Sequence, residues 1–557
     1  MPPDRRRWIH RLLPWPRRRF VLALDLSRPV TDGAPGSPVA RMAGARGPSL
    51  REVVAALEEA ARDRRVGALV ARVDAPADSW AHAQELAGAV RAFRASGKPT
   101  FAHAQTFSEA GDAVLAYLVA SAFEEVHLQP TGEVGVVGVG VVQPFVADLL
   151  DKLGVVPQLD HRHEFKTAKN LLTERAFTEA HREAADRIVA NLQEQLLDAV
   201  VGGRGLARDR AAELVDRAPL LAEEARDHHL VDRLAYRDQT MAAAFARVGP
   251  QARLLTLRQY VALLRRRQRP DQPTVALIHG RGAIQVGRGR PSPLGPVMGA
   301  DTVVTAFQQA VRDQRVRAIV FRVDSGGGSA VASDAIRRAV AYAREAGTPV
   351  VVSMGSLAGS GGYWIAMDAD RILASPATLT GSIGVVYGKL VARELRHKVG
   401  ITTDEVHRGA NALMFSSDQP FTDAQWDQVG QLLDRVYDDF VERVAAGRGL
   451  PREQVQQIAR GRVWTGADAR QRGLVDELGG YREAFAAARR LAGLPADARL
   501  RVRVLPRLPA SHRLGLRPGA AAGLRAVLGR LEATVDDPAG AHARMPDWAG
   551  PAARPGR

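Results

Sequence analysis

The feature that most constrains the fold of this chain is an internal repeat, at a spacing of about 250 residues. Three pairs of segments share it, the last with a slip of one residue: 63–74 with 313–324, 97–102 with 347–352, and 131–135 with 380–384. Within the first pair, DRRVGALVARVD recurs as DQRVRAIVFRVD. A long-range spacing that stays nearly constant over several segments indicates two copies of one domain in tandem.

Each copy alternates short apolar strands with amphipathic helices. In the second copy, the strands are expected at 317–323 and 349–354 and the helices at 304–313 and 333–346. Strands that alternate with helices of this length predict parallel βαβ units. A chain of 557 residues also exceeds what one hydrophobic core usually serves. We therefore expect an α/β fold built as a tandem repeat of two domains.

The composition divides the chain into five parts. They are a basic arm at 1–19, an N-terminal domain at 20–264, a linker at 265–273, a C-terminal domain at 274–500, and a tail at 501–557. The tail is rich in Arg, Pro, Ala and Gly, which bury too little apolar surface to fold, so we expect it to be poorly ordered.

The residue composition and charge argue against several kinds of site and partner. It has no cysteine, which excludes a disulfide scaffold, a thiol nucleophile and a thiolate metal site. The net charge of +16 comes mainly from arginine, because the chain has only six lysines. No basic helix with interleaved aromatic residues supports a nucleic-acid partner. We expect neither nucleic acid, nor a cofactor, nor a metal.

Neither a signal peptide nor a transmembrane helix is expected. The most apolar stretch, 134–142, is glycine-rich and too short to span a bilayer. The arm lacks an apolar region long enough for a signal peptide, but it carries Trp8, Trp15 and seven arginines. That mixture suits either peripheral contact with an anionic membrane or a disordered basic leader. We expect a cytoplasmic or peripherally membrane-associated protein.

The segment 349–366, PVVVSMGSLAGSGGYWIA, is the first candidate for chemistry. It predicts a strand, a tight turn at Ser360 and a helix. Small residues on both sides of Ser360 permit a sharp turn that exposes the hydroxyl at the edge of a sheet, as in other serine nucleophiles. The alternative interpretation is a serine that caps the helix N-terminus.

A second glycine cluster, DSGGGS at 324–329, follows a predicted strand and precedes another helix. Backbone N–H groups in such a turn stabilise an oxyanion in acyl transfer, although similar turns also bind phosphate. Because Ser360 lies in the same domain, we favour an oxyanion site. The expected donors are the N–H groups of Gly327, Gly328 and Gly361.

Three motifs together resemble the signal peptide peptidase A family. They are SGGYWIA at 360–366, LTGSIG at 379–384 and VDSGGGS at 323–329. The resemblance covers roughly residues 20–495 and is to the long bacterial form, which has two crotonase-like (ClpP-like) domains per chain. The family usually has a proline where Gly326 stands, and its long form has an N-terminal membrane anchor, which we do not expect in this sequence.

The resemblance implies a role for each of three side chains. Ser360 corresponds to the nucleophile, and Lys166, within FKTA at 165–168, corresponds to the general base. Ser382 corresponds to the serine that orients this lysine. The resemblance further implies a homo-oligomer, a tetramer in this family, and peptide substrates.

The repeat supplies independent support for a site shared by both copies. Shifting Ser360 back by the repeat spacing reaches Ala110, so the first copy has no nucleophile there. Aligning the segments around Lys166 places it opposite Ala410, so the second copy has no lysine. Two copies that lack complementary residues indicate one composite site. Whether its halves come from one protomer or from neighbours is left open.

A lysine base must be neutral, which requires a pKa well below about 10.4. Burial against apolar walls provides that decrease. Glu164 is the only acid close to Lys166 in sequence. Lys169 is the competing candidate, and we interpret it as a surface charge on a helix.

Histidines offer weaker alternatives. His161, His163 and Glu164 suggest a metal site, but their alternation along a strand leaves no third ligand on one side. His103 and His407 are candidates for a serine triad, but neither lies in a recognisable motif.

The leading hypothesis is therefore a serine endopeptidase that cleaves remnant signal peptides and other short apolar peptides, a substrate class implied by the resemblance. One alternative is a crotonase-type acyl-CoA enzyme, which has the same fold and uses glycine N–H groups as an oxyanion hole. Another is a catalytically inactive scaffold with this fold, which the presence of Ser360, Lys166 and Ser382 argues against.

Overall fold

A computed structural model describes residues 19–32, 48–108, 113–289, 291–292 and 295–506. The basic arm up to residue 18, Ala110 and the tail from residue 507 lie outside the described residues. The described chain divides into two compact units. The larger comprises the described residues up to 148 together with 159–387 and 427–506, and the smaller comprises 149–158 and 388–426.

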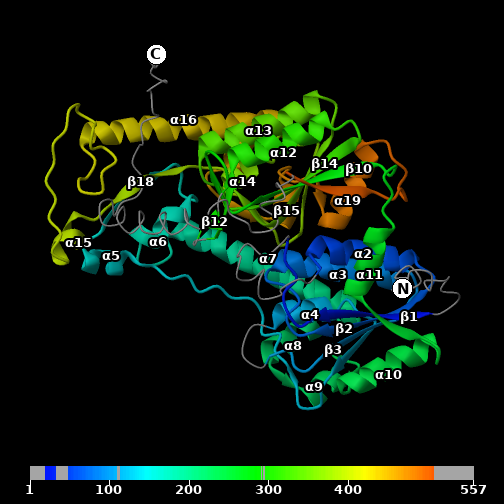
Figure 1. Cartoon of the computed structure of the whole chain (residues 1–557). Helices are drawn as coiled ribbons and strands as arrows, with labels where there is room; N and C mark the ends of the chain where they lie inside the picture. The colour runs from blue at the N-terminus through cyan, green and yellow to red at the C-terminus, as the bar shows by residue number, and fades with distance from the viewer. Residues whose placement is uncertain (1–18, 33–47, 109–112, 290, 293–294, 507–557) are drawn as a thin grey trace, which may run out of the picture. The chain divides into compact units, whose positions relative to one another are not determined.

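Within the larger unit, the first copy of the repeat forms a six-stranded sheet in the order β8-β4-β3-β2-β1-β9 (Figure 1). Its strands are β1 Phe20–Leu26, β2 Val66–Val73, β3 Thr100–Ala104, β4 Glu125–Leu128, β8 Arg233–Leu234 and β9 Arg253–Thr256. Neighbouring strands in it are parallel. Most side chains of β1, β2 and β3 are buried, as the continuous Val, Leu and Ala runs predict.

The second copy repeats this arrangement with additional strands. The path β19-β17-β15-β14-β10-β21 forms one sheet, in which β16 also pairs with β15 and with β20. The bounds are β10 Thr274–Arg281, β14 Val316–Ser325, β15 Val350–Gly359, β16 Arg371–Ala374, β17 Leu379–Gly381, β19 Val463–Thr465, β20 Glu477–Leu478 and β21 Arg501–Leu505. Only the β17–β19 pair of this sheet is antiparallel. The predicted α/β tandem repeat is confirmed.

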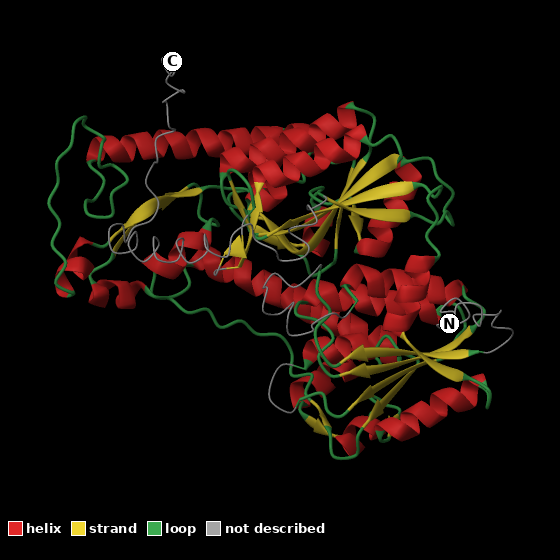
Figure 2. Ribbon diagram, viewed as in Figure 1, coloured by secondary structure: helices red, strands yellow, loops and turns green. Residues whose placement is uncertain are grey.

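Helices cover the sheets of both copies (Figure 2). Matching helices in the two copies are α2 Leu50–Arg62 and α12 Ala300–Arg312, α3 Trp80–Arg94 and α13 Ala330–Glu345, α4 Val114–Ala120 and α14 Gly361–Trp364, α7 Glu179–Arg204 and α16 Asp423–Arg448, α8 Arg208–Arg217 and α17 Arg452–Ile458, α9 Ala222–Asp227 and α18 Gly466–Gln471, and α10 Arg237–Val248 and α19 Tyr481–Leu491. The apolar stripes of these helices account for their placement on the sheets.

The remaining elements are short or join larger ones. They are β5 Glu133–Val134, α5 Ala147–Leu153, β6 Val156–His161, the 3-10 turn η2 Thr167–Lys169, α6 Asn170–Thr173, β7 Leu220–Leu221, α11 Leu257–Arg266, β11 Ala283–Gln285, β12 Pro291–Ser292, β13 Gly295–Gly299, β18 Val386–Val391 and α15 Arg393–Lys398. None of the described helices is long and apolar enough to cross a bilayer.

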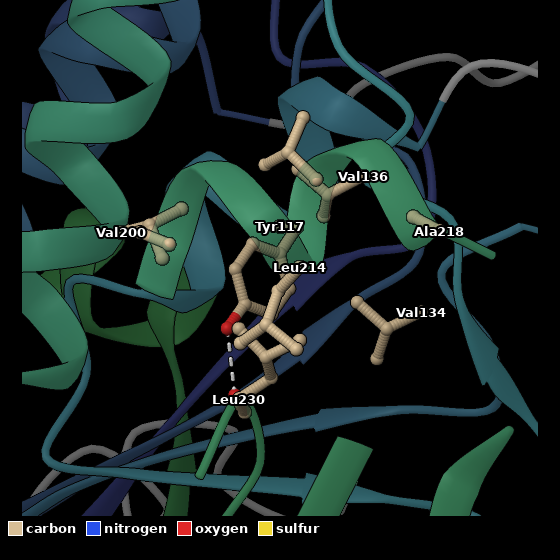
Figure 3. A pocket seen from close by; sticks show the side chains of 9 residues that line it. Tyr117, Val134, Val136, Val200, Leu214, Ala218 and Leu230 are labelled. Atoms are coloured by element: carbon tan, nitrogen blue, oxygen red, sulfur yellow. Dashed lines mark hydrogen bonds between the residues drawn. The ribbon is translucent and has the colours of Figure 1, made fainter. Parts of the chain in front are cut away.

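The two copies share an equivalent tyrosine hydrogen bond as well as a similar backbone. In the first copy, the buried Tyr117 hydroxyl donates to the Leu230 carbonyl at 2.7 Å, among apolar side chains from several elements (Figure 3). In the second copy, Tyr363 donates to the Leu474 carbonyl at 2.9 Å. The two copies therefore share tertiary contacts in addition to their sequence similarity.

Two expected boundaries differ from the structure. Residues 501–505, assigned to the tail, form β21, which pairs with β10 at the sheet edge. Their alternation of Arg with Val is a strand pattern that the arginine-rich composition obscured. At the linker, α11 continues to Arg266, and turns follow as far as residue 273.

A buried ion cluster joins the two copies inside the larger unit. Arg322 on β14 is 1% exposed. It donates to Asp32 at 2.7 Å and to Glu85 at 2.5 Å, both from the first copy. Its guanidinium also lies over the Tyr481 ring, 4.4 Å from the centroid. Apolar residues of the second sheet, such as Leu277, belong to the same buried cluster as the helices of the first copy.

The smaller unit consists of short elements held together by polar contacts. The Arg396 guanidinium pairs with Asp418. Lys389 lies over the Phe421 ring, 4.2 Å from the centroid. Ala410, the predicted counterpart of Lys166, lies in a turn of this unit.

Candidate active site

Ser360 lies between the end of β15 and the start of α14. Its backbone has φ 54° and ψ −122°, a conformation that is uncommon for a residue with a side chain and that concentrates at functional sites. The Ser360 N–H donates to the Gly381 carbonyl at 2.8 Å, and the Ser360 carbonyl accepts from Tyr363 and Trp364. The side chain makes no capping bond to the helix, which disfavours the interpretation of Ser360 as a simple N-cap.

The glycine loop after β14 packs directly against this turn. A Cβ atom on Gly327, which has φ 99°, would lie 2.6 Å from the Gly361 nitrogen. A Cβ on Gly361 would lie 2.6 Å from Ser333 Oγ. Only glycine allows so close an approach, so the two glycine clusters seen in the sequence form one structural feature.

The three expected oxyanion donors differ in their hydrogen bonding. The Gly327 N–H donates to Ser325 Oγ at 3.1 Å. Within the described part of the chain, the N–H groups of Gly328 and Gly361 have no acceptor. These two donors are therefore available beside Ser360, whereas that of Gly327 is already in use.

Lys166 comes from the first copy and precedes the turn η2. It is 4% exposed. Its Nζ lies 3.0 Å from Ser360 Oγ, and it donates to Ser382 Oγ at 2.9 Å and to the Ser382 carbonyl at 2.8 Å. Burial lowers the pKa of Lys166 to about 7. The structure thus brings together the three side chains singled out in the sequence.

Ser382 is held by the turn that follows β17. Its backbone has φ 50°, a second positive value at a residue with a side chain. Its N–H donates to the Arg462 carbonyl at 2.8 Å. This bond holds the turn in which the Ser382 carbonyl and hydroxyl both accept from Lys166.

Two glycines of the second copy make room for Lys166. A Cβ on Gly384 would lie 3.2 Å from Lys166 Cδ. A Cβ on Gly461, which has φ 82°, would lie 2.4 Å from the Lys166 nitrogen. Gly384 belongs to a recognised motif, but sequence reasoning missed Gly461. Its only sequence signal is a glycine between two arginines.

Lys169 does not join this site. It ends η2 and is half-buried, and among the described residues it makes no hydrogen bond to Ser360 or Ser382. Of the two lysines, only Lys166 reaches Ser360 and Ser382, and Lys169 is half-buried in a 3-10 turn, where a surface charge on a helix was expected.

The histidine candidates lie in other elements or have other partners. The His163 ring contacts the Tyr437 ring at 4.4 Å between centroids, and Glu164 pairs with Arg460 at 2.9 Å. The described residues hold no group of three or more His, Asp or Glu side chains arranged for a metal ion. His103 is buried within β3 of the first sheet, and His407 is an exposed residue of the smaller unit.

Comparisons with known proteins match both copies. The sequence profile of peptidase family S49 matches residues 92–249 and 342–495. Protease 4 of Salmonella typhi is 33% identical over 506 residues, covering 86% of this chain and 79% of that protein. The chloroplastic serine protease SPPA of Arabidopsis thaliana is 27% identical over 463 residues, covering 82% and 67%. A ClpP1 mutant structure from Listeria monocytogenes has a TM-score of 0.25 at 16% identity, covering 37% of this chain and 93% of that one.

Proposed function

This chain belongs to peptidase family S49 and is a serine-type peptidase, and we propose that Ser360 is its nucleophile and Lys166 its general base. The observation that carries the proposal is the 3.0 Å separation of Lys166 Nζ from Ser360 Oγ. The Lys166 pKa of about 7 supports it, because a substantial fraction of the amine is then neutral near neutral pH.

In the first step, Ser360 Oγ attacks the scissile carbonyl carbon as its proton moves to Lys166 Nζ. The C–O bond of a tetrahedral intermediate forms, and the carbonyl π electrons move onto oxygen. Lys166 becomes an ammonium ion, whose protons have acceptors at the Ser382 hydroxyl and carbonyl. Ser382 therefore orients the amine and stabilises its charged form.

In the second step, the ammonium proton moves to the leaving amine as the C–N bond breaks. An acyl ester on Ser360 remains, and Lys166 is neutral again. Water then attacks the ester and gives its proton to Lys166, which returns it to Ser360 Oγ as the peptide acid leaves. One lysine acts as base and acid in both halves of the reaction.

We assign the oxyanion site to the N–H groups of Gly328 and Gly361. Both adjoin Ser360 and have no acceptor among the described residues. Gly327 shapes the loop, and its N–H would first have to leave Ser325 Oγ. Two preorganised donors at a developing oxyanion are typical of acyl-transfer sites.

The proposed substrates are remnant signal peptides and other short apolar peptides. Besides the family resemblance, exposed apolar side chains near Ser360 favour this class. Leu357, three residues before Ser360, is 36% exposed, and Val331, the second residue of α13, is 75% exposed. Apolar surface of this kind is consistent with extended apolar peptides.

Two further proposals concern partners. The family resemblance suggests a homo-oligomer, a tetramer in relatives of this type. The arginines and tryptophans of the arm suggest peripheral contact with anionic membranes, and apart from Arg19 the arm lies outside the described residues.

Replacement of the nucleophile tests the proposed function most directly. Ser360→Ala is expected to reduce peptide hydrolysis by at least about 10³-fold, because no other group forms the acyl ester. A fluorophosphonate probe should label the wild-type protein and not this variant. Labelling also separates the peptidase from an acyl-CoA enzyme or an inactive scaffold. Turnover by Ser360→Ala above that of a mock preparation would contradict the assignment.

A further inference from the structure

A three-residue segment of the second copy, Arg460–Arg462, surrounds the lysine segment of the first copy. Arg460 pairs with Glu164 at 2.9 Å. Gly461 lies against the backbone of Lys166, and its N–H donates to the Ile383 carbonyl at 2.7 Å. The segment lies immediately before β19 in the chain.

Arg462 makes the most unusual contacts of this segment. Its guanidinium lies 4.6 Å from the centroid of the Phe165 ring and 4.5 Å from that of the Trp464 ring. Its Nη1 donates to Glu183 on α7. The side chain is 16% exposed, so the two ring contacts are largely shielded from water. Cation–π contacts become stronger as they are shielded from water.

Both aromatic partners are connected to the site, Phe165 through the adjacent Lys166 and Trp464 through strand pairing near Ser382. Phe165 immediately precedes Lys166, so the position of its ring constrains the backbone from which the lysine side chain starts. Trp464 lies in β19, which pairs with β17 through Thr380, two residues before Ser382. The guanidinium thus links the lysine segment of one copy to the strand next to Ser382 in the other.

The backbone of Arg462 contacts the site from a second direction. Its carbonyl accepts the Ser382 N–H at 2.8 Å. Ser382 in turn accepts two hydrogen bonds from Lys166 Nζ. Arg462 therefore contacts Phe165 through its side chain and binds Ser382, the hydrogen-bond acceptor of Lys166, through its carbonyl.

We propose that Arg462 is a positioning residue for the Lys166–Ser360 pair, acting through Phe165 and Ser382. This inference rests on the proposed function of Lys166 as the base. Arginine suits the role better than lysine, because a planar guanidinium stacks on both rings while its N–H groups still reach Glu183. Small displacements matter here, since proton transfer requires Nζ within hydrogen-bond reach of Ser360 Oγ.

The charged groups around Lys166 do not compete with this explanation. Those on the segments 162–169 and 460–462 are Arg162, His163, Glu164, Lys169, Arg460 and Arg462, and Glu183 on α7 pairs with Arg462. Glu164 forms an ion pair with Arg460, and burial is the cause of the lowered Lys166 pKa. If the Phe165 ring lost its partner and the Lys166 backbone shifted, the amine would leave its buried position and water would reach it more easily. The ammonium would be favoured, and the Lys166 pKa would rise.

The test compares Arg462→Gln with Arg472→Gln in the full-length protein. The Arg472 guanidinium also lies over Trp464, 3.8 Å from the ring centroid, and among the described residues it does not contact Phe165, so Arg472 is a matched control. For Arg462→Gln, we expect kcat to fall about 10–100-fold with KM changed less than about 2-fold. The acid limb of kcat/KM should move to higher pH. Arg462→Lys should be intermediate, and Arg472→Gln should stay within about 2-fold of wild type.

A wild-type kcat and an unshifted acid limb in Arg462→Gln would overturn the inference, and so would an equal loss in Arg472→Gln. Phe165→Leu provides a second variant in case Arg462→Gln does not fold, and it should reproduce the lower kcat and the shifted limb. The double variant should lose little more than either single one, because the two act through one contact. Fully additive losses would contradict a shared path.

A different result would contradict the proposed function itself. An active Lys166→Ala would remove the base assignment itself. An inactive Lys166→Ala together with wild-type behaviour of Arg462→Gln would overturn only the positioning role of Arg462.

Discussion

Arg72 and Arg322 occupy the same position of the repeat but have opposite environments. Arg72 in the first copy has a 32% exposed side chain and pairs with Asp74 beside it. Arg322 in the second copy is buried and binds Asp32 and Glu85 from the first copy. The same sequence motif thus serves as a surface charge in one copy and as the ionic contact between copies in the other. The difference depends on what each sheet faces, because the motif itself is the same.

The two copies also differ at the site. In the second copy, β15 continues to Gly359 and carries Ser360 at its end, whereas β3 ends at Ala104. Tyr117 and Tyr363 make equivalent hydrogen bonds, and counting back three residues from each places Val114 opposite Ser360. The constant spacing had pointed to Ala110, which lies outside the described residues. Either counterpart has no hydroxyl, so the second copy alone supplies one.

The first copy supplies the lysine, and the largest expected effect tests this division. Lys166→Arg should lose at least about 10³-fold in kcat/KM, because a guanidinium stays protonated at any accessible pH. Lys169→Arg should stay near wild type. In the wild-type protein, kcat/KM should rise with pH through about 7, since only the neutral amine accepts the Ser360 proton.

Steady-state kinetics of both variants and a pH–rate profile check this expectation. If Lys169→Arg were inactive and Lys166→Arg active, the general base would be Lys169, one helical turn after Lys166. The contribution of the first copy to the site would then have to be reassigned.

The next effect concerns the contact between the copies. Arg322→Gln should lower the free energy of unfolding by about 3–5 kcal/mol, because it removes the buried guanidinium that pairs with Glu85 and Asp32 and leaves Asp32 paired with His82. Arg72→Gln, the matched change in the other copy, should cost less than about 1 kcal/mol. Denaturant unfolding of both variants measures the difference. Equal losses would mean that burial of the repeated arginine does not distinguish the copies.

The smallest effect concerns the serine that holds the lysine. Ser382→Ala should reduce kcat by about 10–100-fold, because it removes one of the two acceptors of Lys166 Nζ and keeps the other, the Ser382 carbonyl. Thermal unfolding should change little, since the backbone bonds of the turn remain. A kcat as low as that of Ser360→Ala would instead make Ser382 as essential as the nucleophile.

The sequence by itself determined the two-copy α/β organisation, because strand and helix periodicity and a repeated motif are local patterns. It also singled out Ser360, whose small neighbours predict the turn that the backbone adopts. Lys166 and Ser382 followed from a family resemblance. Short-range pattern and motif were sufficient for these inferences.

Only the tertiary structure decided which residues meet. Lys166 and Ser360 are separated by 194 residues, and Arg462 reaches Phe165 from almost 300 residues away. No local pattern encodes such contacts, because they depend on how two sheets and their helices pack. The same reason explains why Gly461 could not be recognised and why Arg322 could not be told from Arg72. Burial, which lowers the Lys166 pKa and gives Arg322 its partners, is a property of the packed molecule.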